Sequence, residues 1–384
     1  SSGGAQDGPL VSEADFLAPL ERGEHPAVSA LTREIGEAQA AEIAARTFSA
    51  PELGLIREAP EGAARQVDVT FTWQPPRPDR RSLAIDAAAV GTRAAQARLA
   101  VSRRAVLESA RAAFARWAVG ALTAQVLAGR VEALEDLSTR ERRRAEAGEV
   151  SGLEAQRVAL AAARARSELA RAETERTTAS ALARVWRPDL PSGAVPELPA
   201  LPAPPPLPLP DAHAHPRVAA LASDLERERM LERLSGKVAE LPAIVAGWQR
   251  QESAVDSFDG AILGLSWPLP MVNRGRADRA AARARVASLE ALLAFTELEV
   301  SAQREAALDA YTSLRTAALA GRGAPSGVPA LLDAANASFT AGETDLTDLL
   351  DTLRSASETE VDALELYAEA LAAHRRLEST LGDP

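Results

Sequence analysis

The chain contains an internal repeat, which limits its possible folds more than any single motif does. The run HPAVSALTREIGEAQA begins at His25, and the similar run HPRVAALASDLERERM begins at His215. Proline in the first turn is typical of a helix start, so both runs predict a helix. Three apolar positions also match: Val28 with Val218, Leu31 with Leu221, and Ile35 with Leu225.

The same landmarks follow each helix start in the same order. A proline comes first, then extended segments that end in tryptophan, then a long helical run, and then an Ala-Gly-Glu turn. Alanine-rich helices resemble one another through composition alone, but composition does not explain matched proline, tryptophan and glycine positions. We therefore infer an internal duplication, marked by Pro51 and Pro242, Trp73 and Trp267, and Gly148 and Gly342.

The duplication divides the chain into four parts. Residues 1–24 are expected to be extended, and PELPALPAPPPLPLP within residues 191–212 predicts a stiff polyproline-type linker. The first repeat covers residues 25–190, with a helix, a hairpin at 53–74, and long helices at 79–147 and 152–186. The second repeat covers residues 213–384, with a helix, a hairpin at 242–268, and long helices at 275–321 and 329–381.

Both repeats contain segments with the period-two alternation of a β-strand. In residues 66–73, apolar Val67, Val69, Phe71 and Trp73 alternate with polar Asp68, Thr70 and Thr72. In residues 261–267, Leu263, Leu265 and Trp267 alternate with Gly264 and Ser266, and residues 243–249 show a similar pattern. Each repeat therefore predicts one hairpin between helices.

We expect these hairpins to pair between chains, because the remaining elements are long rods that cannot cover both faces of a sheet. A barrel closed by several copies would satisfy every strand edge. In such a barrel the lipid-facing residues are Val67, Val69, Phe71, Trp73, Leu263, Leu265 and Trp267, and the lumen-facing residues are Asp68, Thr70, Thr72 and Ser266. The alternative is a soluble pair of hairpins packed on helices.

The helical runs are too long for one compact domain. Residues 79–147 contain no proline, and a helix of that length extends about 100 Å. Hydrophobic residues make up 46% of the chain but aromatic residues only 4%, so alanine and leucine must supply close packing between rods. The fold class is therefore mainly α with a small β part, in a helical barrel or coiled coil, and a large catalytic pocket is not expected.

Charge and residue types exclude several classes of function. The net charge of −11 gives no general attraction for nucleic acid, and without cysteine there is no thiol nucleophile or thiolate metal site. His213 and His215 have the spacing of a metal pair but lack acidic neighbours. We therefore expect no enzyme activity, no cofactor and no metal site. The opening SSGGAQDGPL has no signal-peptide core, and a removed signal with an acylated cysteine before Ser1 is one expectation.

These features together resemble the TolC-like outer-membrane efflux proteins, over nearly the whole chain. The strongest local match is the segment from Phe339 to Asp351 (FTAGETDLTDLLD), and its counterpart is residues 147–156 (AGEVSGLEAQ). The start of the helix after Trp73-Gln74-Pro75 looks closest to the heavy-metal and cation branch. The resemblance implies a homotrimer in the Gram-negative outer membrane, with a twelve-stranded barrel, a periplasmic helical tunnel and a mixed equatorial region that includes the linker.

The resemblance also implies roles for residues near the two turns. The tips at Gly148, Glu149, Gly342 and Glu343 are where a periplasmic adaptor would dock, linking the duct to an inner-membrane transporter of the RND or a similar type. Asp348 and Asp351 would form rings of carboxylates at the tunnel entrance. Phe339, Thr344 and Glu154 are gate candidates, although Phe339 and Thr344 stand where a tyrosine and an arginine often occur in the family.

Two other functions fit parts of the sequence. One is an exit duct for type I secretion, and the other is a soluble coiled-coil scaffold. Acidic residues near Gly342 also have a simpler explanation, since carboxylates favour the first turn of a helix.

Overall fold

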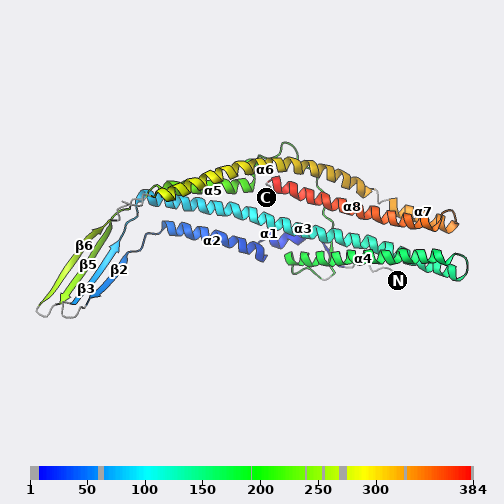
Figure 1. Ribbon diagram of the computed structural model, residues 1–384, viewed down its shortest axis with the longest axis horizontal. Coiled ribbons are helices and arrows are strands. Elements are labelled where there is room, and N and C mark those ends of the chain that lie inside the picture. Colours follow the sequence, from blue (N-terminus) through cyan, green and yellow to red (C-terminus); the bar gives the residue numbers. More distant parts are fainter. Residues whose placement is uncertain are drawn as a thin grey trace. The chain divides into compact units, whose positions relative to one another are not determined.

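The structure, a computed structural model, describes residues 8–58, 65–191, 193–237, 240–252, 256–267, 275–323 and 327–381. The first repeat holds α2 (Pro26–Arg46), β2 (Glu52–Glu58), β3 (Arg65–Trp73), α3 (Pro78–Glu146) and α4 (Gly152–Trp186). The second holds α5 (Pro216–Ser235), β5 (Ala243–Glu252), β6 (Ser257–Ser266), α6 (Arg276–Gly323), α7 (Val328–Ala341) and α8 (Leu346–Leu381) (Figure 1). The other elements are β1 (Leu10–Val11), α1 (Glu13–Glu21), β4 (Val195–Pro196) and the 3₁₀-helix η1 (Ala212–Ala214). The predicted fold class, mainly α with a small β part, is confirmed.

The compact units of the structure do not coincide with the sequence repeats. Unit 1 comprises Ser1–Ser29, Ser102–His215 and Glu299–Pro384, and unit 2 comprises Ala30–Val101 and Pro216–Leu298. Each unit takes corresponding parts of both repeats, because the long helices α3 and α6 pass from one unit into the other. The sequence placed the boundary between the two repeats at residues 191–212. The two compact units are not separated at that boundary.

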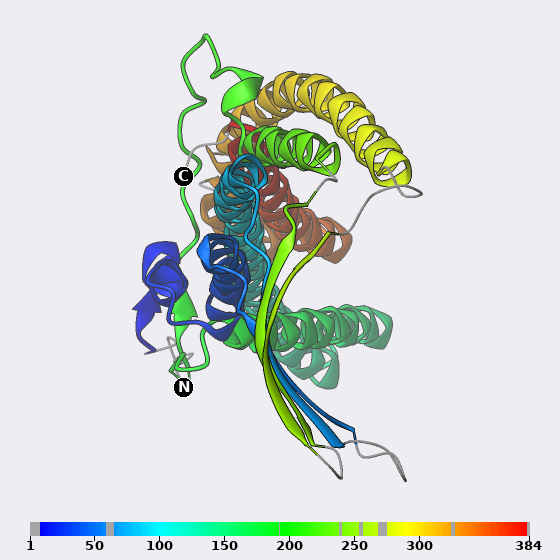
Figure 2. The same cartoon turned by 90° about the vertical axis from the view of Figure 1, so that its left-hand side faces the viewer.

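Unit 2 contains one antiparallel sheet in the strand order β2-β3-β5-β6. The two hairpins join through β3 and β5, which pair from Arg65 opposite Glu252 to Trp73 opposite Ile244 (Figure 2). The expectation that the hairpins pair between chains is therefore wrong for this contact, which lies within one chain. It overlooked that two duplicated hairpins can lie edge to edge in one chain, leaving β2 and β6 as the outer strands.

Ion pairs connect the helices of unit 2. The Arg229 guanidinium lies 2.7 Å from the Glu290 carboxylate and joins α5 to α6. Arg98 on α3 pairs with Asp224 on α5. Beside the sheet, the Asp79 carboxylate at the start of α3 lies 2.9 Å from Lys237 and 2.9 Å from Arg77. Hydrogen bonds from these two cations lower the pKa of Asp79 to about 2.

Unit 1 begins with a helix where the sequence suggested an extended segment. Helix α1 starts after Ser12, whose side-chain oxygen accepts a hydrogen bond from the Asp15 amide at 3.1 Å. Its apolar face buries Phe16, Leu17 and Leu20 against α3 and α4, and the Phe16 and Phe114 ring centroids are 5.1 Å apart. The expectation of an extended segment at 1–24 is wrong over these residues, because the buried apolar face stabilises a short helix that contains Pro19.

Small residues let α3 and α4 approach closely. The buried positions of α4 are mainly alanine, at the spacing of one helical face: Val158, Ala162, Ala165, Ala172, Ala179 and Ala183. A Cβ added at Gly120 of α3 would lie 3.6 Å from the Arg176 Cα. Close packing through alanine, which the composition predicted, therefore holds this helix pair together, with Gly120 at one point of contact.

The proline-rich linker docks onto α6 and α8 as a strap, defined here as residues 195–210. Its first residues form β4, which pairs in parallel with β1. Tyr311 donates its hydroxyl hydrogen to the Pro202 carbonyl at 2.5 Å, and Tyr367 donates to the Pro199 carbonyl at 2.7 Å. Burial raises the pKa of both phenols, so both remain donors.

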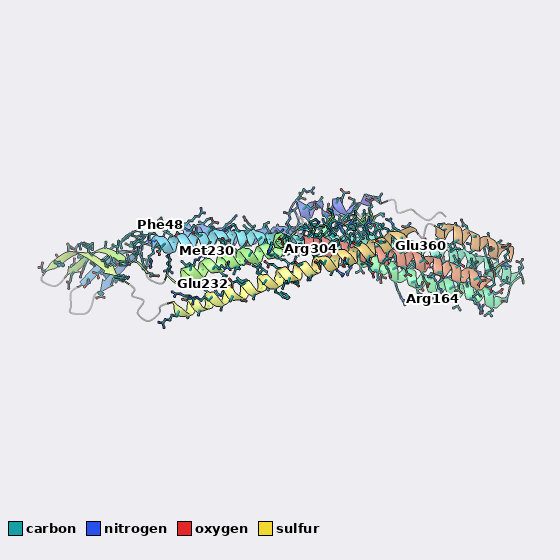
Figure 3. All side chains as sticks on the ribbon, turned by 90° about the horizontal axis from the view of Figure 1, so that it is seen from above. Phe48, Arg164, Met230, Glu232, Arg304 and Glu360 are labelled. Atoms are coloured by element: carbon teal, nitrogen blue, oxygen red, sulfur yellow. The ribbon has the colours of Figure 1, made fainter. Side chains whose placement is uncertain are left out.

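A buried arginine on α6 completes this contact. Arg304 donates through Nε and Nη2 to the Thr380 carbonyl of α8, at 3.0 and 2.8 Å, and through Nη1 to the Pro210 carbonyl (Figure 3). The strap is therefore held through its backbone carbonyls and through Leu201, which is buried in the same apolar cluster as Tyr311 and Tyr367.

The second repeat ends in two helices. The expected bounds 329–381 covered both of them and ignored the Ala-Gly-Glu turn that the sequence also predicted, and the chain forms α7 and α8, separated at Gly342. Gly342 has a φ of 78°, a left-handed value that ends a right-handed helix. Among the described residues, no helix is long and apolar enough to cross a membrane.

Candidate functional site

An apolar band crosses all four strands of the sheet on one face. The register places side chains of neighbouring strands in common rows, so that Leu55, Val69, Trp248 and Ala261 share one row. The next rows contain Leu53, Phe71, Ala246 and Leu263, and then Trp73, Ile244 and Leu265. The band reaches both outer strands, and its outermost leucines are strongly exposed, Leu53 at 76% and Leu263 at 85%.

The band has distinct ends. Toward the hairpin loops, Val67 shares its row with charged Arg57, Arg250 and Asp259. At the helical end, the Trp267 indole nitrogen donates to the Glu240 carbonyl at 3.1 Å, so its polar atom is satisfied while the ring is 60% exposed. From Val67 to Trp73 a strand extends about 20 Å.

The opposite face of the sheet is more polar. Asp68, Thr70 and Thr72 lie on it, as does Ser266 on the outer strand, and Gln66 donates to the Asp68 carboxylate at 2.9 Å. Apolar Ile56, Val245, Phe258 and Ile262 are exceptions on this face. The predicted division of these side chains between two faces is thus present in the sheet, and what each face contacts stays a prediction.

The two helical reversals have the same geometry. Gly148 has a φ of 79° and Gly342 has a φ of 78°. The amide of the next residue donates back over a full turn in each case, from Glu149 to the Arg144 carbonyl and from Glu343 to the Ser338 carbonyl, both at 2.9 Å. Both are Schellman turns, which need a residue that tolerates positive φ.

Asp348 and Asp351 lie on α8 just after the second reversal, and both side chains are exposed. Asp345 accepts a hydrogen bond from the Asp348 amide at 2.8 Å, so Asp345 caps the helix. The Asp351 carboxylate lies 3.4 Å from Arg354. Buried Leu346, Leu349 and Leu353 occupy the other side of the helix. The two carboxylates therefore face away from the core of unit 1, and a ring in an assembly stays a prediction.

The three gate candidates have different surroundings. Phe339 packs against a core cluster that includes Leu134, Val158 and Leu349. Glu154 forms a capping box at the start of α4, where its carboxylate accepts from the Ser151 amide at 3.2 Å and its amide donates to the Ser151 side chain. Thr344 is exposed in the turn. Phe339 and Glu154 thus have structural roles here, and their role as gates stays untested.

The histidines are not placed as metal ligands. Among the described residues, no group of three or more His, Cys, Asp or Glu side chains could hold a metal ion. His25 and His215 instead contact backbone carbonyls through Nε2, Val185 at 3.0 Å and Ser379 at 2.8 Å.

No protein-family model matches the chain, and no curated protein matches it. Solved structures do match. CusC, described for transmembrane channel formation, has a TM-score of 0.77 at 12% identity, over 100% of this chain and 95% of that chain. The CmeC outer membrane channel of Campylobacter jejuni has a TM-score of 0.76 at 10% identity, over 96% and 85%. The open MtrE outer membrane channel of Neisseria gonorrhoeae has a TM-score of 0.72 at 16% identity, over 96% and 88%.

The chain has the fold of these outer-membrane channels. The fold that the sequence resemblance implied is therefore confirmed over nearly its full length. In this channel fold, sequence reasoning found both hairpins, the two faces of the strands and the two reversals. It missed the donors that hold the strap, Arg304, Tyr311 and Tyr367. The one available signal was that both tyrosines of the chain lie on long helices, where a buried hydroxyl needs a partner.

Proposed function

We propose that the chain is the outer-membrane exit duct of a tripartite efflux system, acting as a homotrimer. The observation that carries the proposal is the exposed apolar band, which runs to both outer edges of a four-stranded sheet. An exposed apolar face with two unpaired strand edges favours closure with further copies inside a lipid bilayer. Three sheets would then form a twelve-stranded barrel, with the helices continuing as a periplasmic tunnel.

In this assembly the band contacts outer-membrane lipid and the polar face lines the lumen. The fold likeness to CmeC and MtrE, both described as outer membrane channels, supports this location. An N-terminal lipid anchor belongs to the same proposal. The cargo would be small molecules or metal cations, and metal cations fit the branch that the sequence resembles most.

Arginine substitutions on the two faces of β3 test the barrel. Val69→Arg should cost about 2 to 4 kcal/mol if the residue lies near the bilayer midplane, because a lipid-exposed guanidinium is poorly solvated. Thr70→Arg is less suitable as a control, since Thr70 lies between Gly54 and Gly247 in a crowded row. Thr72→Arg is the better lumen control. Loss of heat-stable trimer on a size-calibrated column in detergent is the readout.

A soluble scaffold makes different predictions in that experiment. It would stay in solution without detergent, and Val69→Arg and Thr72→Arg would have equal effects. Either result would contradict the duct.

The two Schellman turns would contact a periplasmic adaptor, which in turn binds an inner-membrane transporter. Six matched tips in a trimer make a ring that suits a second ring of helical hairpins. Because the chain contains no cysteine, Glu149→Cys and Glu343→Cys introduce single crosslinking sites. Crosslinks to the adaptor are expected, and crosslinks only to the transporter would contradict this arrangement.

Asp348 and Asp351 would form carboxylate rings at the tunnel entrance and favour cations. Single-channel recording of the double variant Asp348→Asn, Asp351→Asn should show weaker cation selectivity and weaker block by multivalent cations. Unchanged selectivity and block would leave these residues with only a role at the helix start. The gate candidates Phe339, Thr344 and Glu154 can be compared by closed-state conductance in the same recordings.

A further inference from the structure

A cavity of about 610 Å³ lies within unit 1, between α3 and the α7–α8 pair. Its walls are mainly apolar and include Leu122 and Val126 of α3, Leu332 of α7, and Leu353 and Leu364 of α8. Ligand sites for drug-sized molecules commonly have volumes of about 300 to 1,000 Å³ and mainly apolar walls with few polar groups. The cavity has the size and lining of such a site, and one chain supplies all of it.

One carboxylate lies in this apolar lining. Glu360 lies on α8 (Figure 3). It belongs to a stripe of that helix that also carries Ala356, Ala363 and Tyr367, and all four residues line the cavity. Within the part of the chain that the structure describes, the Glu360 carboxylate has no ion pair and no hydrogen-bond partner. Burial raises the pKa of Glu360, as expected for a carboxyl group that loses water without gaining a partner.

The two basic residues of the lining already have partners. Arg130 donates through Nη1 to Glu168 at 2.7 Å, which neutralises it across the α3–α4 pair. The Arg322 guanidinium lies 5.0 Å from the centre of the Tyr367 ring, a cation–π distance. Glu360 is therefore the charge of the cavity that lacks a counter-charge.

We propose that this cavity binds a lipophilic organic cation, with the positive charge beside Glu360 and the apolar body among the leucines of α3, α7 and α8. A cation without N–H groups suits the site, because its charge spreads over apolar substituents and loses little hydration on entry. The proposal goes beyond an exit duct and does not depend on it, since the site lies within one protomer.

Equilibrium dialysis with two shape-matched ions tests the charge preference. The probes are the tetraphenylphosphonium cation and the tetraphenylborate anion, measured against the full-length protein in one detergent. Saturable phosphonium binding is expected at one ion per chain, weakened on the order of 10-fold by Glu360→Gln, which keeps the shape and removes the charge. Borate binding should not weaken in this variant.

Glu358→Gln is the matched control. Glu358 is exposed on the same helix and lies 3.8 Å from Arg354, outside the cavity. It should leave phosphonium binding unchanged. Equal weakening by both variants, or no weakening by Glu360→Gln, would overturn the proposal.

A second variant tests the cavity without changing its charge. Gly129 lines the cavity, and a Cβ added there has no neighbouring atom within 4 Å. Gly129→Leu should fill the space and abolish saturable phosphonium binding while the thermal unfolding of the protein is retained. Retained binding in this variant would mean that the ions partition into detergent or bind elsewhere, and the proposal would fall.

Discussion

The matched faces of α3 in the first repeat and α6 in the second pack against different partners, a helix for α3 and a proline-rich segment for α6. The spacing from Trp73 to Trp267 (267 minus 73) and from Gly148 to Gly342 (342 minus 148) is 194 in both cases, so positions of α3 and α6 can be matched directly. Ala110 and Trp117 of α3 then correspond to Arg304 and Tyr311 of α6. Ala110 and Trp117 of the first repeat pack on helix α1. Arg304 and Tyr311 of the second repeat bind the proline-rich strap.

The difference follows from how each partner satisfies its own polar groups. A helix pairs its backbone N–H and C=O groups internally, so α1 can be covered by apolar Ala110, Phe114 and Trp117. A polyproline segment has no internal hydrogen bonds and leaves its carbonyls free. The covering helix must then donate, which Arg304 and Tyr311 do. A duplicated helix face can thus change from apolar to donating when its partner changes.

Other features are the same in both repeats. The histidines that precede α2 and α5 contact carbonyls near the ends of α4 and α8, and both reversals are Schellman turns. The helices between these points differ, since α3 continues through Gly129 whereas α6 ends at Gly323, its matched position. The duplication has therefore kept the turns and helix starts while the faces between them changed.

Replacing Arg304 with alanine, the residue at the matched position of the first repeat, should lower the stability of the protein most. Arg304→Ala introduces the residue of the first repeat and leaves the Thr380 and Pro210 carbonyls without a charged donor, which should cost about 3 kcal/mol. Thermal unfolding of the detergent-purified protein, followed by circular dichroism, measures the loss. Arg283→Ala, an exposed position on the same helix, serves as control and should cost less than about 1 kcal/mol. Equal losses would show that Arg304 does not hold the strap.

Removing one hydroxyl should have an intermediate effect. Tyr311→Phe keeps the ring and leaves the Pro202 carbonyl unpaired, so we expect a loss of about 1 to 2 kcal/mol. Hydrogen exchange should be faster at the non-proline amides of the strap, including Leu198 and Leu201. In the first repeat, Phe114→Leu, which introduces the residue found at the matched position Leu308, should leave exchange in the strap unchanged. Faster exchange there as well would mean that both repeats act on the strap.

The smallest loss of stability is expected from alanine substitutions at the two helical reversals, which can be compared with each other. Gly148→Ala and Gly342→Ala each force alanine into a left-handed conformation, although neither added Cβ meets a neighbouring atom. Each should cost about 1 kcal/mol, and the two losses should agree within about 0.5 kcal/mol. Apparent melting temperatures of the two variants check this. A clear inequality would show that one tip carries strain or contacts that the other lacks.

Sequence patterns predicted the features that depend on side-chain periodicity or on special backbone angles. Alternation located β3 and β6, and Gly148 and Gly342 marked the helix ends because few other residues accept a positive φ there. The sequence did not predict α1. Its apolar residues Phe16, Leu17 and Leu20 have helical spacing over only about one turn, and glycine and proline lie near them in the sequence. The sequence also did not predict the docking of the strap. The donors on α6 and α8 bind backbone carbonyls, which every residue has, so the docking requires no particular residue types in the strap.

The candidate site was predicted to a similar extent. The register confirms which strand residues share a face, but it adds charged Arg57 and Arg250 to the row of Val67, which alternation along one strand could not show. The cavity around Glu360 could not be predicted either, since it depends on how α3 lies against two helices far away in sequence.

Recognition of the strap through main-chain atoms has a consequence for how this region tolerates mutation. Every residue has a carbonyl oxygen, so replacing the side chain of Pro202 or Pro210 does not remove the acceptor that Tyr311 or Arg304 uses. A library that randomises exposed strap positions should therefore yield many functional variants, whereas randomising Arg304 should yield very few. The strap can thus drift in sequence while its place on the protein is preserved by the two helices that hold it.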